Sequence, residues 1–167
     1  MVAVHAVRIV DAVRTALFHL DARLGELGWS DHHGWWLAVG TGTTLAGLVI
    51  GEGGRRPIFG ALAGPPSHAV ARQLGNLLGE AGMPDGGYLL LDASRGGFGR
   101  FDSALISFLK ETEHASGIPL EPVYTAKAMM ALRLYVEGGY FSRGTRLVFV
   151  HTGGLQGRRA ALAQWPS

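Results

Sequence analysis

The stretch that decides the fold runs from Trp35 to Ile50 and reads WWLAVGTGTTLAGLVI. Its first five residues, Trp35–Val39, form a short apolar run that ends at Gly40, which predicts a buried strand. A helix can begin at Thr44, and we expect it to end in the glycines that follow Ile50. A strand, a glycine-rich turn and a helix in direct succession are typical of α/β proteins.

The rest of the chain repeats this alternation. Further strands are predicted at Pro57–Ala63, Tyr88–Leu91 and Arg146–Val150. Helices are predicted at about Val4–Leu27, from an N-cap at Ser67 to Gly82, from an N-cap at Asp102, and from an N-cap at Thr125 to Gly138. Strands that are apolar on both sides belong to sheets covered by helices on both faces. The sequence therefore predicts a three-layer α/β/α fold with a mostly parallel sheet, as a single domain over residues 1–167, and a short basic tail after Gly157.

Composition excludes several classes of protein. Of the 167 residues, 47% are hydrophobic and 17% are charged, which argues against a disordered chain. No apolar run reaches the roughly 18 residues of a membrane span, and the first twenty residues do not resemble a signal peptide, so we expect a cytoplasmic protein with no membrane partner. The absence of cysteine removes disulfides and thiolate ligands. The net charge is only +2 and the arginines are scattered, so no nucleic-acid partner is expected.

Two glycine-rich turns follow predicted strands. They are Gly40–Thr44 and His151–Gly154, and ligands of parallel sheets bind at such carboxyl ends of strands. Backbone amides in a turn that leads into a helix can hold a phosphate group. The first turn lacks the third glycine of the dinucleotide fingerprint and the Gly-Lys-Ser/Thr ending of a P-loop, so a nicotinamide or ATP site is disfavoured. Each turn alone is equally compatible with a plain connection that binds nothing.

Two further segments are more specific. They are Pro122–Met129, which reads PVYTAKAM, and His151–Arg158, which reads HTGGLQGR. Together with the turn after Gly40, and in this order, they resemble the carboxyl-terminal half of the 1-aminocyclopropane-1-carboxylate deaminase/D-cysteine desulfhydrase family. That family belongs to the tryptophan-synthase-β-like, fold type II enzymes that use pyridoxal 5'-phosphate. The resemblance, from about Val7 to Arg159, implies a small amino-acid substrate that is deaminated by α,β-elimination or by opening of a cyclopropane ring.

The resemblance also assigns roles to individual residues. It implies that Tyr124 is the catalytic residue beside the substrate, and that Thr125 and Thr152 lie near the pyridine nitrogen. Thr125 stands where deaminases of the family tend to carry glutamate, which favours the desulfhydrase-like branch. The cofactor-binding residues that it implies are Gly40, Thr41, Gly42, Thr43 and Thr44 around the phosphate, together with Thr125, Thr152 and Gly153.

The chain departs from the family pattern in three places. Thr43 replaces a glycine of the phosphate turn, where a side chain could oppose a positive φ or crowd the phosphate. Phe98 replaces a second active-site tyrosine. The amino-terminal half, which carries the Schiff-base lysine, has no counterpart here, and neither Lys110 nor Lys127 lies in a sequence context that suggests the desolvation such a lysine needs.

These departures leave several functions open. We expect a chain that is inactive alone, whether a shortened or degenerate protein or one completed by a second chain that supplies the lysine. A homodimer is also expected from the family. The alternative is a non-catalytic module that binds a phosphate-bearing metabolite or a protein partner.

The histidines and paired large residues have simpler interpretations. His32 and His33 are predicted to lie in a surface loop, and no metal site is predicted because no third ligand is spaced to join them. His151 is expected to position the turn that follows it by a hydrogen bond. The pairs Trp35–Trp36 and Met129–Met130 are predicted to be core residues.

Overall fold

The fold was obtained as a computed structural model, which describes residues 13, 16–17, 19–65 and 68–163. Residues 19–26 are helical, and the elements that follow are β1 (Gly34–Val39), α2 (Thr43–Glu52), β2 (Ile58–Leu62), α3 (His68–Glu80), β3 (Tyr88–Asp92), α4 (Ser103–Ser116), α5 (Thr125–Glu137), β4 (Leu147–Val150) and α6 (Leu155–Ala163). None of the helices within those ranges combines the length and the apolar character that a membrane span requires.

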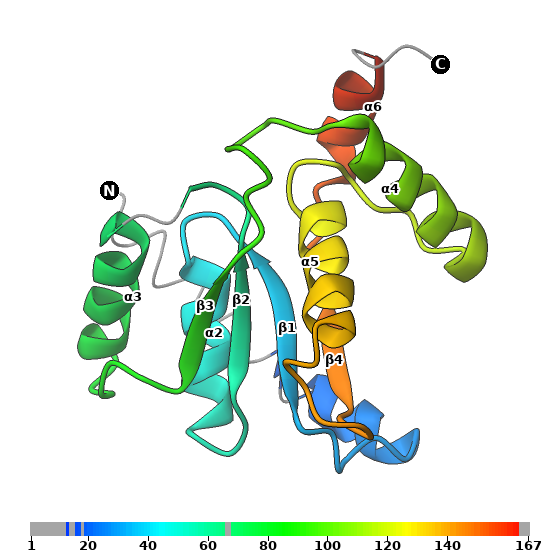
Figure 1. Cartoon of the computed structure of the whole chain (residues 1–167). Coiled ribbons are helices and arrows are strands. Elements are labelled where there is room, and N and C mark those ends of the chain that lie inside the picture. The colour runs from blue at the N-terminus through cyan, green and yellow to red at the C-terminus, as the bar shows by residue number, and fades with distance from the viewer. Residues whose placement is uncertain (1–12, 14–15, 18, 66–67, 164–167) are drawn as a thin grey trace.

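The four strands form one parallel sheet in the order β3-β2-β1-β4 (Figure 1). β1 is central and buried along its whole length, because its side chains alternate between two apolar layers. Trp35, Leu37 and Val39 face α2 and α3, whereas Trp36 and Ala38 face α5. The predicted α/β fold with a parallel sheet is therefore confirmed.

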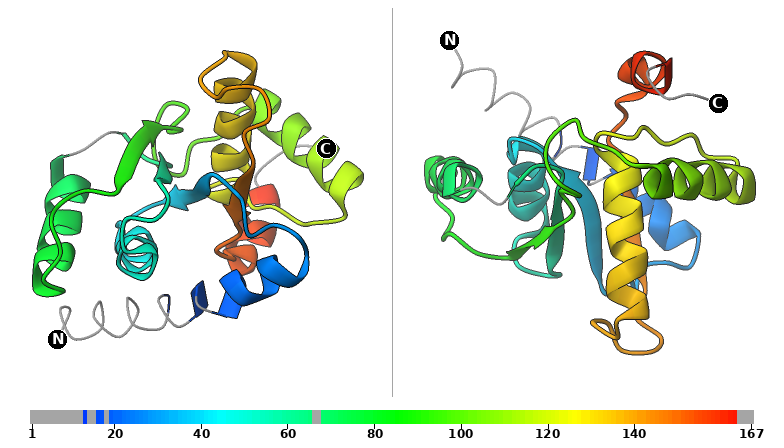
Figure 2. Two further views of the ribbon diagram at one scale, coloured as in Figure 1. Left: turned by 90° about the horizontal axis from the view of Figure 1, so that it is seen from below. Right: turned by 45° about the horizontal axis from the view of Figure 1, so that its top comes forward.

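Helices cover both faces of the sheet (Figures 1 and 2). α2 and α3 pack on one face, α5 packs on the other, and α4 lies outside α5 and packs against it through Leu105 and Leu109. The two buried indoles keep their hydrogen bonds: Trp35 Nε1 donates to Glu52 Oε1 at 2.7 Å and Trp36 Nε1 donates to the Ala128 carbonyl at 2.9 Å. These bonds allow large polar-tipped side chains to be fully buried next to the central strand.

Most predicted elements agree with the structure, and the carboxyl-terminal helix is an addition to them. No helix was predicted in the short basic tail after Gly157, but Leu155–Ala163 forms α6. Asp102 caps α4 as predicted, since its Oδ1 accepts the Leu105 amide hydrogen at 2.8 Å. The predicted N-cap at Ser67 and residues 4–12, 14, 15 and 18 of the first predicted helix lie outside the described residues.

Candidate functional site

Three segments far apart in the sequence meet at the carboxyl edge of the sheet. A Cβ atom on Gly40, directly after β1, would lie 3.1 Å from Cε1 of Tyr124 at the start of α5. A Cβ atom on Gly154, after β4, would lie 2.9 Å from Cγ of Glu121, whose carboxylate binds the amide of Tyr124. The turn after β1, the start of α5 and the turn after β4 are therefore in contact.

The turn after β1 is shaped by Gly42. Gly42 is the N-cap of α2 and has a φ of +93°, and a Cβ atom there would also lie 3.1 Å from Cγ of Leu74 on α3. Positive φ at this turn falls on Gly42 and not on Thr43, which is the first residue of α2, so the strain expected from Thr43 does not arise. Within the described part of the chain no side chain caps α2, so the amide hydrogens of its first turn face the carboxyl edge of the sheet without a side-chain acceptor from those residues. Such an uncapped helix start fits a phosphate group.

The start of α5 is capped by Glu121, which the sequence analysis missed. Glu121 is 3% exposed, and its Oε1 accepts the amide hydrogens of Tyr124 and Thr125, each at 2.6 Å. Its Oε2 accepts the Val123 amide at 2.8 Å. A carboxylate at this position also interacts favourably with the positive end of the helix.

Thr125 is therefore not the N-cap that was predicted. It is the first residue of α5, and its buried hydroxyl accepts a hydrogen bond from the Glu121 amide at 2.9 Å while donating to the Glu121 carbonyl at 3.3 Å. The predicted role of Thr125 near a pyridine nitrogen stays a prediction. In this structure the hydroxyl serves the turn that precedes α5.

Tyr124 is half-buried between the turn after β1 and the loop after β3. The ring of Phe98, from that loop, meets the Tyr124 ring edge-on at 5.5 Å between centroids. Burial, and to a lesser degree the charge of Glu121, raise the pKa of the Tyr124 phenol above its usual value. A tyrosine phenol is protonated at neutral pH even at its usual pKa, and the raised pKa makes this proton harder to remove. Phe98 itself is 61% exposed at the edge of this region.

His151 fixes the turn after β4, as the sequence suggested. Its Nε2 donates to the Pro119 carbonyl at 2.9 Å, so its Nδ1 carries the lone pair that accepts the Gly153 amide hydrogen at 3.1 Å. Both bonds require the same neutral tautomer. The predicted cofactor-binding residues of this turn, Thr152 and Gly153, are exposed and half-buried, respectively.

The environments of the other predicted residues vary. In the turn after β1, Gly40 and Thr41 are exposed, Gly42 is buried, and Thr43 and Thr44 are half-buried. The hydroxyls of Thr41 and Thr43 lie 3.2 Å apart.

Lys127 overturns one expectation drawn from the sequence. The side chain is fully buried, and burial together with the charge of Arg95 lowers the pKa of its amine. Nζ donates to the carbonyls of Gly97 at 2.6 Å, Ser94 at 2.8 Å and Ala63 at 3.2 Å. Three acceptors match the three hydrogens of an ammonium group, so Lys127 joins α5 to the segments that follow β2 and β3. Lys110, in contrast, is exposed on α4 as predicted.

A charged cluster lies at the amino-terminal end of β1. Asp21, His32 and Glu52 each place one potential ligand atom within 4.8 Å of the others, and His32 is buried, so its predicted surface position is wrong. Arg56 Nη1 lies 3.0 Å from Glu52 Oε1 and 3.2 Å from Asp21 Oδ1, and Arg55 Nη2 lies 3.0 Å from Asp21 Oδ2. Because the guanidinium groups neutralise both carboxylates, we assign this cluster to ion pairs in which the arginines that follow α2 link residues 19–26 to Glu52 at the end of that helix.

Comparisons with known proteins bear on this arrangement. No family profile matches the sequence. A relative from Pyrococcus horikoshii, to which the name 1-aminocyclopropane-1-carboxylate deaminase is provisionally assigned, is 32% identical over 130 residues, which are 72% of this chain and 39% of the relative. The 1-aminocyclopropane-1-carboxylate deaminase of Mesorhizobium japonicum is 29% identical over 68% of this chain and 37% of its own length. A crystal structure of an ACC deaminase homologue superimposes on 95% of this chain and 49% of its own, with a TM-score of 0.72 and 26% identity.

This chain belongs to the 1-aminocyclopropane-1-carboxylate deaminase family.

The chain spans about two fifths of the length of the curated deaminase relatives and about half of the solved deaminase homologue. The match to the solved structure extends over nearly the whole of this chain, which agrees with the wide extent of the predicted resemblance. Within this deaminase-family fold, the residues that organise the carboxyl edge but gave no sequence signal are Glu121 and Lys127. Glu121 is separated from the helix that it caps by the turn at Pro122–Val123, and the three acceptors of Lys127 lie 30 to 64 residues away in the sequence.

Proposed function

We propose that this chain is the phosphate-binding part of a pyridoxal-phosphate-dependent deaminase or lyase, and that a second chain supplies the lysine it needs. The observation that carries the proposal is the contact between Gly40, Tyr124 and the Gly154–Glu121 pair at the carboxyl edge of the sheet. In a deaminase-family chain, this convergence supports a site for one ligand with a phosphate and a ring.

Residues already in place fit such a ligand. The amides at the start of α2 would hold the phosphate, with Gly40–Thr44 wrapped around it. Thr152 and Gly153 would face the ring from the turn after β4. Pyridoxal phosphate, when bound, supplies an electron sink for negative charge at the α carbon of an amino acid. Tyr124 would hold a proton on its phenolic oxygen, and the raised pKa of the phenol makes this proton harder to remove than that of a free tyrosine.

The substrate that we propose is a small amino acid. Elimination from D-cysteine would yield pyruvate, ammonia and sulfide, and ring opening would apply to 1-aminocyclopropane-1-carboxylate. We favour the desulfhydrase type because Thr125 and not glutamate follows Tyr124. A glutamate at this position could present a carboxylate, whereas the Thr125 hydroxyl is uncharged and engaged with Glu121.

The two lysines of the chain support an external source for the amine. Lys110 is exposed on α4, and the three donors of Lys127 are taken by backbone carbonyls. A complementary chain that carries the lysine would also cover the exposed Thr41 and Thr152. A homodimer of the completed protein is part of the same proposal.

Binding of pyridoxal 5'-phosphate by the purified chain tests this proposal. The experiment compares pyridoxal 5'-phosphate with pyridoxal by calorimetry, in the wild type and in two variants, Gly42→Ala and Gly53→Ala. Both glycines flank α2 with positive φ, but only Gly42 lies at the carboxyl edge. We expect the phosphate ester to bind better than pyridoxal, and Gly42→Ala alone to remove that preference. Equal binding of the two ligands, or an equal loss in both variants, would refute a phosphate site at this turn.

A non-catalytic module that binds a phosphate-bearing metabolite is the second candidate. The engagement of Lys127 by three carbonyls favours it, because the chain then offers no free amine at the buried end of α5. Borohydride treatment in the presence of pyridoxal 5'-phosphate, followed by peptide mass spectrometry, separates the candidates. If pyridoxal 5'-phosphate binds without forming a covalent adduct, and if adding a lysine-bearing chain of this family does not change this result, the non-catalytic module is supported. An adduct on an added chain would support the enzyme.

A further inference from the structure

Phe98 is a large apolar side chain that the fold holds at the surface beside Tyr124. It is 61% exposed, and its ring meets the Tyr124 ring edge-on at 5.5 Å between centroids. Tyr124 lies against Gly40 after β1, and a Cβ atom on Gly64 after β2 would lie 3.6 Å from Cβ of Phe98. The two rings therefore lie next to each other across the carboxyl ends of β2 and β1.

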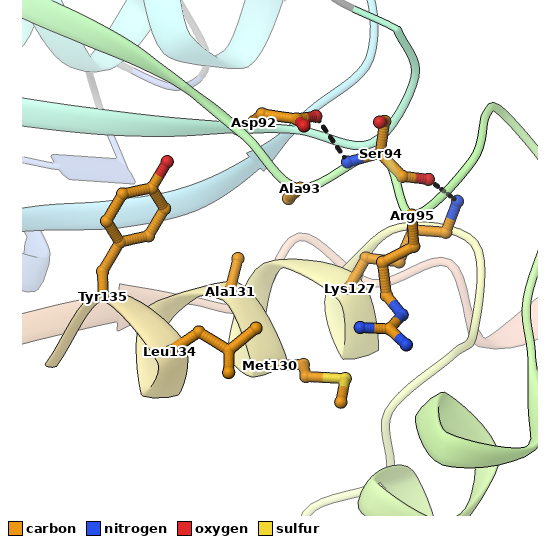
Figure 3. Close-up of a pocket in the computed structure, with 9 residues that line it drawn as sticks. All are labelled: Asp92, Ala93, Ser94, Arg95, Lys127, Met130, Ala131, Leu134 and Tyr135. Carbon is orange, nitrogen blue, oxygen red and sulfur yellow. Dashed lines mark hydrogen bonds between the residues drawn. The ribbon is translucent and has the colours of Figure 1, made fainter. Parts of the chain in front are cut away.

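The loop that carries Phe98 is fixed to the rest of the fold. Arg95 has a φ of 46°, a conformation that L-residues rarely adopt. Lys127 Nζ donates to the carbonyls of Ser94 at 2.8 Å and Gly97 at 2.6 Å, and Figure 3 shows the first of these bonds. A loop held in this way keeps the exposed ring in one position. Backbone strain that the surroundings retain is typical of functional sites.

The surface that this loop presents beside Tyr124 is apolar. The Ser94 carbonyl accepts hydrogens from Lys127 Nζ and from the Gly97 amide, and the Gly97 carbonyl accepts hydrogens from Lys127 Nζ and from the Arg100 amide. Both lone pairs of each carbonyl oxygen are therefore in use. A ligand that contacts Tyr124 from the solvent side meets the Phe98 ring, because the two rings touch, and neither of these carbonyls is free to bind it.

We propose that Phe98 determines specificity at the amino-acid site, and that it selects substrates whose β carbon carries a thiol or an alkyl group over those whose β carbon carries a hydroxyl. The inference rests on the proposed function, because it requires the amino acid to lie beside Tyr124. A hydroxyl placed against the ring loses hydrogen bonds to water and gains none, whereas a thiol is only a weak hydrogen-bonding group. D-Cysteine is consequently preferred to D-serine.

Stable conjugates of cofactor and amino acid test this inference without catalysis, because each carries the phosphate, the ring and the amino acid in one molecule and needs no lysine. The probes are the N-phosphopyridoxyl derivatives of glycine, D-2-aminobutyrate and D-serine. The last two differ only in a methyl group that takes the place of the hydroxyl. Calorimetry on the wild-type chain should give a dissociation constant about tenfold lower for the aminobutyrate derivative than for the serine derivative.

Two variants of Phe98 and one control assign the preference to this ring. Phe98→Ala removes the apolar surface and should bring the two dissociation constants to within about twofold of each other. Phe98→Gln keeps a long side chain but offers the hydroxyl a partner, so it should remove the preference as well. Leu27→Ala is the matched control, since Leu27 is 60% exposed in the turn before β1, and it should keep the wild-type preference.

The glycine derivative separates failure of this inference from failure of the proposed function. If it binds, but the wild type does not favour the aminobutyrate derivative over the serine derivative, Phe98 does not select the substrate. A preference that survives Phe98→Ala or Phe98→Gln would overturn the inference in the same way. If the glycine derivative does not bind, the site for a phosphate and a ring proposed above is absent, and the inference falls with it.

Discussion

Replacement of Lys127 by methionine tests whether this lysine is a structural link or a free amine. The variant removes the donor to three buried carbonyls, of Ala63, Ser94 and Gly97. Two of these keep another donor, since the Ser94 carbonyl also accepts the Gly97 amide at 3.1 Å and the Gly97 carbonyl accepts the Arg100 amide at 3.3 Å. The main cost is therefore one orphaned carbonyl and two weakened ones.

These losses predict a decrease of about 2–3 kcal/mol in the free energy of unfolding. The decrease is no larger than this, because replacing the lysine by methionine removes the cost of burying a charge and because methionine has a similar volume. For a chain of this size, the change corresponds to a melting temperature lower by about 4–12 °C.

Urea unfolding followed by circular dichroism measures this change, with Lys110→Met as the matched control. Lys110 is exposed on α4, so its replacement should alter the free energy of unfolding by less than about 0.5 kcal/mol. The reasoning fails if the two variants are equally stable, or if pyridoxal 5'-phosphate and borohydride modify Lys127 in the folded wild type, since the amine would then be free to react.

Three further predictions concern the elements that frame the site. Asp102→Ala should lower the free energy of unfolding by about 1 kcal/mol at pH 7, because α4 loses its cap. The Leu105 amide lowers the pKa of Asp102 below 3.8, so the wild type is the more stable protein above pH 3.8, and unfolding experiments should show this difference vanish as the pH falls through the lowered pKa. Glu121→Gln should lower the free energy of unfolding by about 1–3 kcal/mol and bring the pKa of Tyr124 back toward 10. Ultraviolet titration of the phenolate measures this pKa, and an unmoved pKa would mean that burial alone raises it. Gly154→Ala should destabilise the fold in thermal unfolding by more than Gly139→Ala, because both have positive φ but only Gly154 lies against Glu121; equal costs would show that the turn after β4 is free to move away from α5.

The elements of the fold could be predicted from the sequence because each is encoded by local pattern. The run Trp35–Val39 is apolar on both sides, and the structure buries it between two layers of helices. The Asp102 cap also follows from a residue type at one position. In such cases the residues that determine the structure are neighbours in the chain.

The interactions that build the site are not local, and the sequence could not specify them. Lys127 lies next to the predicted site, but its burial depends on carbonyls from segments that only the folded sheet brings to α5. Glu121 acts as a cap through its side chain from a turn outside the helix, where N-cap preferences do not apply. His32 was assigned to the surface because its polar neighbours suggested a loop, yet its ring packs against Trp35 at 4.5 Å between centroids.

The most direct test of the account is an amide chemical-shift map of the chain titrated with pyridoxal 5'-phosphate. The account predicts that Thr43, Tyr124 and Gly153 shift together with one dissociation constant, and that inorganic phosphate moves only the signals at the start of α2. Shifts confined to other parts of the surface, or separate dissociation constants for the three residues, would contradict a single site at the carboxyl edge of the sheet.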